Sequence, residues 1–168
     1  MTNADERLEA LAAEVGAWLR QRDWMLATAE SCTGGWISTA VTAIAGSSEW
    51  FDRGFVTYSY AAKEDMLGVS RDSITQHGAV SEQVVREMAA GALQNSIAQV
   101  SLAVSGIAGP GGATADKPVG TVCFAWAVRN GDVICETRHF AGDRRAVRLQ
   151  TVEHALRALM ARTAAPKG

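Results

Sequence analysis

The segment 28–36, Thr-Ala-Glu-Ser-Cys-Thr-Gly-Gly-Trp, constrains the fold of this chain more than any other stretch. A short apolar run at 24–27 precedes it, and a stretch of helical periodicity at 36–45 follows it. A strand that breaks at such a segment and continues as a helix exposes its turn at the carboxyl edge of a sheet. Gly34 and Gly35 allow a ligand to approach the main chain, and the free N–H groups of the helix favour a negative charge there. The pattern predicts a strand–turn–helix unit with a binding turn.

Ser31 lies in this turn, after the carboxylate of Glu30 and before Cys32 and Thr33. The arrangement suits a nucleophilic serine, but serine is also a common helix cap, and the local sequence leaves both interpretations open. We interpret Cys32 as a small buried hydrophobic residue, because free cysteines are among the most buried residue types.

The periodicity of the remaining chain predicts helices that alternate with strands. We expect helices at 5–22, 34–45, 59–67, 81–96 and 143–162, and strands at 24–27, 54–58, 100–104, 119–129 and 133–140. Ser59, Ser81 and Asp143 are the expected helix N-caps. Residues 70–79 are predicted to be a polar loop, and Asn130-Gly131 predicts a type I′ hairpin. The fold class is α/β, with helices on both faces of a mixed, mostly parallel sheet that ends in an antiparallel edge hairpin.

The composition is that of a soluble globular chain. With 168 residues, 48% hydrophobic and 20% charged, it is long enough for one domain, which we expect to span 1–168 with a frayed tail after about residue 163. The net charge of −2 gives no sign of a nucleic-acid-binding surface, and no apolar stretch is long enough to cross a bilayer. The polar, acidic N-terminus is unlike a secretion signal, and three cysteines without metal spacing fit a reducing cytoplasm.

A second glycine-rich loop, residues 105–112, follows the predicted strand at 100–104. Both glycine loops should open at the same edge of the sheet, where ligands collect. Neither loop matches the Walker A pattern or an intact dinucleotide fingerprint.

A nucleophilic serine requires a base, and the sequence offers two candidates. Lys63 lies early in the helix after the second predicted strand, where the positive end of the helix dipole favours a neutral amine. His77 is the alternative, as part of a Ser-His-Asp triad. Position alone also allows Lys63 to be an ordinary surface lysine and Tyr58, at the end of that strand, to be a core residue.

Six blocks of sequence resemble the CinA C-terminal domain family, and they occur in order from residue 29 to residue 148. The blocks are Ala-Glu-Ser-Cys-Thr-Gly-Gly at 29–35, Thr-Tyr-Ser at 57–59 with Ala-Lys at 62–63, His-Gly-Ala-Val-Ser at 77–81, Ser-Gly-Ile-Ala-Gly-Pro at 105–110, Lys-Pro-Val-Gly-Thr-Val at 117–122, and Gly-Asp-Arg at 142–144 with Val-Arg at 147–148. The resemblance implies a three-layer α/β/α sandwich, in agreement with the predicted elements.

The resemblance also implies a reaction. Stand-alone members of the family hydrolyse the carboxamide of nicotinamide mononucleotide to nicotinic acid mononucleotide and ammonia, in pyridine nucleotide recycling. Carried over by motif, Ser31 is the nucleophile and Lys63 and Tyr58 activate it, although nearby Tyr60 leaves open which tyrosine assists Lys63. Ser105 stands where the family frequently has threonine, and 113–116 is a variant of a segment usually richer in glycine and acidic residues.

The reaction further requires an oxyanion site and a partner for the substrate's phosphate. Main-chain N–H groups at 33–35 are expected to receive the oxyanion, and Arg144, Arg145 and the loop 105–112 to hold the phosphate. The substrate-binding residues that we predict are Glu30, Thr33, Gly34, Gly35, Ser105, Gly106, Gly109, Arg144 and Arg145. No metal or other cofactor is expected.

Other functions are open on the sequence alone. The domain also occurs fused to a larger partner in competence/damage-inducible proteins, so a non-catalytic nucleotide-binding or regulatory module is one alternative. An amidase or esterase with another substrate is a second. We expect a cytoplasmic homo-oligomer, with a dimer favoured, that binds a small nucleotide and neither nucleic acid nor a membrane.

Overall fold

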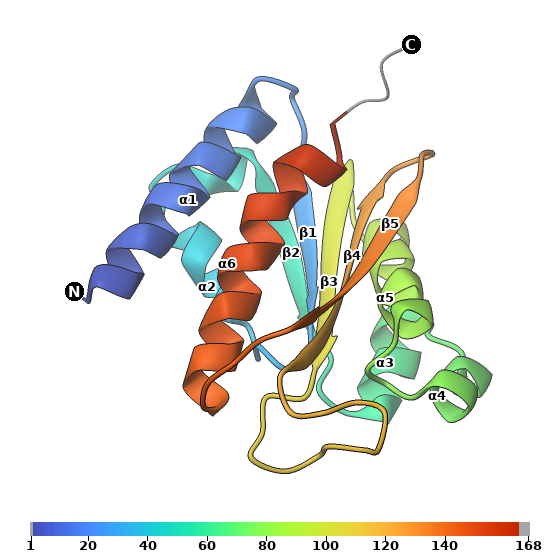
Figure 1. Ribbon diagram of the computed structural model, residues 1–168. Coiled ribbons are helices and arrows are strands. Elements are labelled where there is room, and N and C mark those ends of the chain that lie inside the picture. The colour runs from blue at the N-terminus through green and yellow to red at the C-terminus, as the bar shows by residue number, and fades with distance from the viewer. Residues whose placement is uncertain (1, 165–168) are drawn as a thin grey trace.

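A computed structural model describes residues 2–164 as a five-stranded mixed sheet between two layers of helices (Figure 1). The strands are β1 (Leu26–Glu30), β2 (Phe51–Val56), β3 (Val100–Gly106), β4 (Thr121–Val128) and β5 (Val133–His139). Their order in the sheet is β2-β1-β3-β4-β5. β1 pairs in parallel with β2 and β3, whereas β4 is antiparallel to β3 and β5. All strands except β4 therefore run in one direction, and the predicted mixed sheet with an antiparallel edge hairpin is confirmed.

Helices cover both faces of the sheet, as the three-layer prediction requires. One layer holds α1 (Asn3–Arg20), α2 (Trp36–Thr42) and α6 (Arg144–Arg162). The other holds α3 (Tyr60–Leu67), α4 (Arg71–His77) and α5 (Glu82–Gln94), and Figure 1 shows the two groups on opposite sides of the strands. A 3-10 turn, η1 (Ser47–Glu49), follows Gly46 and leads into β2.

The two faces of the sheet differ in side-chain size. The face toward α1, α2 and α6 carries large residues, Leu26, Leu102, Phe124 and Trp126 among them. The face toward α5 carries small ones, namely Ala27, Ala29, Ala103, Ala125 and Ala127. Small side chains let α5 lie close to the strands, and the buried Ser101 Oγ donates a hydrogen bond of 2.7 Å to the main-chain oxygen of Ala89 in α5.

The predicted helix caps are confirmed. The side chains of Ser59, Ser81 and Asp143 accept hydrogen bonds from main-chain N–H groups in the first turns of α3, α5 and α6. Each satisfies a donor that the start of a helix leaves unpaired. Gly68 ends α3 in the left-handed conformation, with φ of +67°.

Five sequence predictions are corrected by the structure. The second strand, expected at 54–58, is β2 at Phe51–Val56, so Tyr58 lies beyond its end. Residues 70–79 contain the helix α4, because Ser70 caps it and Ile74 is buried. β1 continues through Glu30, where a turn was expected, and α2 ends at Thr42, not at 45. In the hairpin only Asn130 has a positive φ, +59°, whereas a type I′ turn requires two such residues.

Two further expectations concern the ends and surface of the chain. The predicted frayed tail after about residue 163 lies mostly outside the described residues, and within them Thr163 is buried with its hydroxyl on the Leu159 carbonyl. Among residues 2–164, no helix has the length and apolar composition needed to span a membrane.

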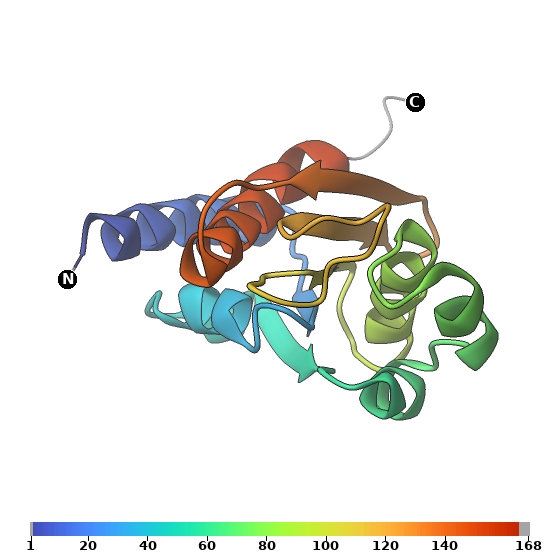
Figure 2. The same cartoon turned by 60° about the horizontal axis from the view of Figure 1, so that its bottom comes forward.

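The parallel strands bring three chain segments to one edge of the sheet. The turns after β1 and β2 and the loop 107–120 after β3 all leave the carboxyl ends of their strands, and α6 begins nearby. Figure 2 brings this edge forward and shows the loop between the start of α6 and the helices α3 to α5.

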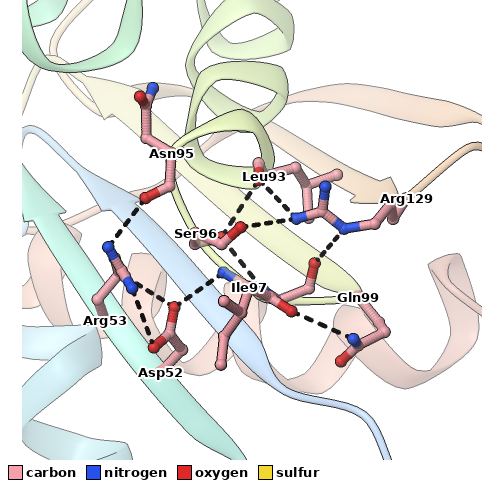
Figure 3. Close-up of polar contacts among 9 residues, drawn as sticks. Asp52, Arg53, Leu93, Asn95, Ser96, Ile97, Gln99 and Arg129 are labelled. Carbon is pink, nitrogen blue, oxygen red and sulfur yellow. Dashed lines mark hydrogen bonds and ion pairs between the residues drawn. The ribbon is translucent and has the colours of Figure 1, made fainter.

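The opposite edge is closed by arginine side chains (Figure 3). Arg129 donates hydrogen bonds to the main-chain oxygens of Leu93, Ser96 and Ala98, where α5 ends. Arg53 binds the oxygen of Asn95, and its neighbour Asp52 accepts from the N–H of Ile97. The carbonyls at a helix C-terminus need such donors. These side chains of this edge therefore serve to hold the fold together.

We predict that Gly91→Ala destabilises the protein, although alanine is normally the better helix residue by about 1 kcal/mol. A Cβ atom at Gly91, in α5, would overlap the main-chain carbonyl of Leu67 at the end of α3. The expected loss is about 1–3 kcal/mol in the free energy of unfolding, measured by urea denaturation. Ala90→Gly at the exposed neighbouring position should lose only about 1 kcal/mol, from helix propensity. A Gly91→Ala protein more stable than the parent would contradict the tight contact.

Candidate active site

Glu30 ends β1 and fixes the start of α2. Its buried carboxylate accepts four hydrogen bonds, from the hydroxyl of Thr33 at 2.6 Å, the N–H of Ile37 at 2.8 Å, and the N–H and hydroxyl of Ser38 at 3.0 and 2.8 Å. A negative charge at a helix N-terminus is favourable. Both carboxylate oxygens are occupied, so the structure assigns Glu30 to the scaffold, in contrast to the predicted substrate contact. The Thr33 hydroxyl is occupied in the same way.

Ser31, one residue later, faces the other layer of helices and meets Lys63. The Nζ atom of Lys63 lies 2.9 Å from Ser31 Oγ and 2.7 Å from the main-chain oxygen of Thr57, with the oxygen of Tyr58 at 3.5 Å. Only 8% of Ser31 and 1% of Lys63 are exposed. The lysine that position alone could have placed at the surface is thus buried against the serine.

The surroundings of Lys63 shift its amine toward the neutral form. Burial lowers its pKa from the usual 10.5 to about 8. A neutral amine has two N–H groups and one lone pair. The two N–H groups match the carbonyls of Thr57 and Tyr58, and the lone pair can then accept the Ser31 hydroxyl proton. This is the arrangement that a lysine base requires.

Tyr58 and Tyr60 are both exposed at the surface. The Tyr58 side chain is 60% exposed, and its hydroxyl accepts a hydrogen bond of 3.1 Å from Arg144. Only the main-chain oxygen of Tyr58 approaches Lys63. Tyr60 is 61% exposed and lines a cavity of about 260 Å³ with Ile107 and Lys117. The structure therefore does not bring the Tyr58 hydroxyl to the Ser31–Lys63 pair.

The glycine turn, which we define as residues 31–35, contains main-chain donors for an oxyanion. The N–H of Gly34 donates a hydrogen bond of 3.0 Å to the main-chain oxygen of Ser31. The N–H groups of Cys32, Thr33 and Gly35 have no hydrogen-bond acceptor within residues 2–164. Gly34 and Gly35 have φ of +58° and +99°, so the turn depends on glycine at both positions. Thr33 and Gly35 fit the predicted oxyanion site, and Gly34 does not.

Arg148 contacts the same turn, although sequence reasoning did not select it. Its Nε and Nη2 atoms lie 3.0 Å from the main-chain oxygens of Cys32 and Thr33, respectively. The signal was present, because Arg148 belongs to one of the sequence blocks that carry the family resemblance. Its proximity to the turn, however, depends on how α6 packs, which the sequence does not reveal.

The two arginines predicted to hold phosphate are in different places. Arg144 donates to the main-chain oxygen of Gly109, at 2.8 Å, and to the Tyr58 hydroxyl, so it joins the second glycine loop to the segment after β2. Arg145 lies over the ring of Trp36, 5.4 Å from its centroid. The geometry thus favours Arg144.

The second glycine loop packs against the first. Ser105 is buried in β3, and a Cβ atom on Gly106 would lie 3.2 Å from Cys32 Sγ. Close packing therefore accounts for Gly106. Burial raises the pKa of Cys32 to about 12, which keeps its thiol protonated and supports its interpretation as a core residue.

His77 is not placed as a base. Its main-chain oxygen accepts from Lys117 Nζ at 2.6 Å, and the residue borders a cavity of about 500 Å³ with His139 and Glu82. Neither Ser31 nor Lys63 lines this cavity. Within residues 2–164 there is no cluster of three metal-ligating side chains.

Known proteins resemble this chain in sequence and in fold. The family model for the CinA C-terminal domain matches residues 8–163. The chain is 56% identical over 153 residues to "Nicotinamide-nucleotide amidohydrolase PncC" of Enterobacter agglomerans, covering 91% of this chain and 93% of the relative. It is 52% identical to the protein of the same name from Escherichia coli K12, covering 92% and 94%. The crystal structure of "competence/damage inducible protein CihA" from Agrobacterium tumefaciens matches with a TM-score of 0.88 and 50% identity, covering 92% and 94%.

Burial of Lys63 predicts a specific pH dependence of stability. Between pH 8 and 10.5 the unfolded chain keeps this lysine protonated and the folded protein does not, so its contribution to the free energy of unfolding rises with pH. Below that window its burial lowers the free energy of unfolding by about 3 kcal/mol.

Lys63→Met should therefore be more stable than the parent at neutral pH, and this difference should shrink between pH 8 and 10.5. Urea denaturation of both proteins at several pH values between 8 and 10.5 measures the difference in their free energies of unfolding. The contributions of the other titrating groups are the same in both proteins and cancel in this difference. A difference independent of pH would contradict the lowered pKa.

Proposed function

Because the chain belongs to the CinA C-terminal domain family, we propose that it hydrolyses the carboxamide of nicotinamide mononucleotide. The products are nicotinic acid mononucleotide and ammonia, and the reaction serves pyridine nucleotide recycling. The observation that carries the proposal is the likeness over nearly the whole chain to relatives named for this activity, at 52–56% identity. The buried Ser31–Lys63 pair supplies the chemistry that amide hydrolysis needs.

Ser31 attacks the carboxamide carbon, and Lys63 removes its hydroxyl proton across the 2.9 Å hydrogen bond. The carbonyl oxygen becomes an oxyanion, which the free N–H groups of the glycine turn receive; each such donor contributes about 3 kcal/mol to transition-state stabilisation. Lys63, now an ammonium, protonates the amide nitrogen, so that the C–N bond breaks, ammonia leaves and an acyl-serine ester remains. Water then attacks the acyl-serine ester, again with Lys63 as base, which releases the carboxylate and restores Ser31.

The substrate's phosphate is held by Arg144. Its guanidinium lies between the Gly109 carbonyl and the hydroxyl of Tyr58, whose main-chain oxygen is 3.5 Å from Lys63 Nζ. A guanidinium recognises phosphate oxygens through paired, charge-assisted hydrogen bonds. Tyr58 then orients Arg144 and borders the substrate, in place of the activating contact with Lys63 that the resemblance implies.

The cellular setting is part of the same proposal. We place the activity in the cytoplasm, because all three cysteines are free, as is usual in a reducing compartment. The homo-oligomer, with a dimer favoured, stays a prediction that size-exclusion chromatography with light scattering tests.

The activity test uses the purified chain with nicotinamide mononucleotide, with ammonia and nicotinic acid mononucleotide as the measured products. The parent protein should release both. Lys63→Arg should lose turnover by several orders of magnitude, because arginine keeps the positive charge but cannot act as a base. Ser31→Ala should lose turnover to a similar extent, and both variants should still bind the product.

Each contrary outcome has a different consequence for the proposal. A Lys63→Arg protein with near-normal turnover would end the role of Lys63 as base. Tight binding of the nucleotide without turnover by the parent would favour a regulatory module. Turnover of other amides in preference to the mononucleotide would favour an amidase of different specificity.

We further predict that Arg144→Gln weakens use of the mononucleotide far more than use of nicotinamide riboside, which lacks the phosphate. The measurement is kcat/KM for each substrate, with Arg145→Gln tested in parallel as the other candidate. Loss of one charge-assisted phosphate contact should lower kcat/KM for the mononucleotide by about tenfold or more. Equal losses on both substrates would make Arg144 structural, and a selective loss in the Arg145→Gln protein would move the phosphate contact to that residue.

A further inference from the structure

Arg148 joins α6 to the glycine turn by two parallel hydrogen bonds. Its Nε donates to the Cys32 carbonyl and its Nη2 to the Thr33 carbonyl, each at 3.0 Å. The side chain is half-buried, and its guanidinium lies 5.4 Å from the centroid of the Trp36 ring. A guanidinium presents its N–H groups in a rigid planar fork, so it fixes the positions of two carbonyls at once.

Fixing a carbonyl also fixes an N–H group. The peptide unit is planar and trans, so the carbonyl of Cys32 and the N–H of Thr33 belong to one plane and point in opposite directions. With Arg148 on the carbonyl side, the Thr33 N–H points away from α6. That N–H has no acceptor within residues 2–164. It is therefore a free donor whose direction Arg148 sets.

The next peptide unit behaves differently. Arg148 binds the Thr33 carbonyl. The N–H of Gly34, which belongs to the same peptide unit, donates a hydrogen bond of 3.0 Å to the main-chain oxygen of Ser31. This second contact ties the arginine to the main chain of Ser31 itself. One side chain thus orders both the residue that carries the hydroxyl and a donor two residues later.

The turn needs an external anchor because of its two glycines. Gly34 and Gly35 follow the two held carbonyls, both with positive φ, and glycine restricts the backbone less than any other residue. Glu30 anchors the turn from the α2 side, through the Thr33 hydroxyl. Arg148 is the anchor from the α6 side, and it adds a positive charge at the carbonyl end of the peptide dipole, which strengthens the hydrogen bond that the opposite N–H donates.

We propose that Arg148 is a positioning residue that aims the Thr33 N–H at the oxyanion formed on attack by Ser31. It acts through the peptide unit between Cys32 and Thr33 and does not touch the substrate. The inference rests on the proposed function and adds a positioning residue to its oxyanion site.

The test compares Arg148→Ala and Arg148→Lys with the parent and with Arg157→Ala, which removes an exposed arginine from the same helix. We expect Arg148→Ala to lower kcat for nicotinamide mononucleotide by about 10²–10³, the usual effect of one oxyanion donor, with KM and product binding nearly unchanged. Arg148→Lys should remain impaired, because an ammonium does not bridge two carbonyls as a fork does. Arg157→Ala should behave as the parent.

Chemical rescue separates positioning from simple stabilisation of the fold. Guanidinium or ethylguanidinium at millimolar concentration should restore part of kcat in Arg148→Ala and leave Arg157→Ala unchanged. A rise in KM or a loss of product binding, with kcat kept, would overturn the proposal by making Arg148 a substrate contact. A lower melting temperature with unchanged kcat would overturn it by making the contact purely structural.

A substrate-independent arm keeps this inference distinct from the proposed function. Phosphonylation of Ser31 by a fluorophosphonate, followed by mass spectrometry, requires the nucleophile and the oxyanion donors but no nucleotide. Arg148→Ala should be phosphonylated at least about tenfold more slowly than the parent, with rescue by guanidinium. If the parent fails on nicotinamide mononucleotide but is phosphonylated with this dependence on Arg148, the substrate assignment falls and the positioning role stands. If the parent is not phosphonylated, or the rates are equal, the positioning role falls.

Discussion

The buried carboxylate of Glu30 is the interaction on which the rest of the site depends. It ends β1 and at the same time binds the first N–H groups of α2, so strand and helix form one unit across the glycine turn. Side chains of successive residues in an extended chain point to opposite faces of a sheet. Because the Glu30 side chain points toward α2, the Ser31 side chain points toward the layer that contains α3. The position of the serine hydroxyl therefore follows from the position of the carboxylate. A mobile turn would lose both the serine geometry and the alignment of the free N–H groups.

The second constraint is the layer that delivers Lys63. The alanine face of the sheet lets α5 approach closely, and Gly91 lets α3 approach α5. α3 carries Lys63, whose amine reaches Ser31 from a buried position. Small residues far from the serine thus determine how deeply the lysine is buried, and burial is the first cause of its lowered pKa. Packing of the fold and basicity of the amine are linked through this one helix.

Local patterns predicted most of the fold, and tertiary contacts account for what they missed. Caps at Ser59, Ser81 and Asp143 depend on neighbours three residues away, so the sequence shows them directly. The burial of Lys63 depends on another helix, and the contact of Arg148 on a segment 116 residues away, so neither is visible in local spacing. The sequence predicts a substrate contact for Glu30, because its role as a cap for α2 depends on the strand continuing to residue 30. The direction of the Tyr58 hydroxyl likewise depends on Arg144, on the last helix.

The pleat of β1 also separates charges that would otherwise work against the proposed chemistry. A carboxylate close to Lys63 would favour the ammonium and remove the base. Glu30 is adjacent to Ser31 in sequence, but its charge is directed to the opposite face and met there by four donors. The positive charge of Arg148 lies on the carbonyl side of the turn, where it polarises the peptide units. The Glu30 carboxylate thus lies at the start of α2, and the Arg148 guanidinium lies against the carbonyls of the glycine turn. The Ser31 hydroxyl and the Lys63 amine contact each other on the opposite face of the sheet from Glu30. Burial, which lowers the pKa of Lys63 to about 8, leaves the amine neutral in roughly one molecule in ten at neutral pH.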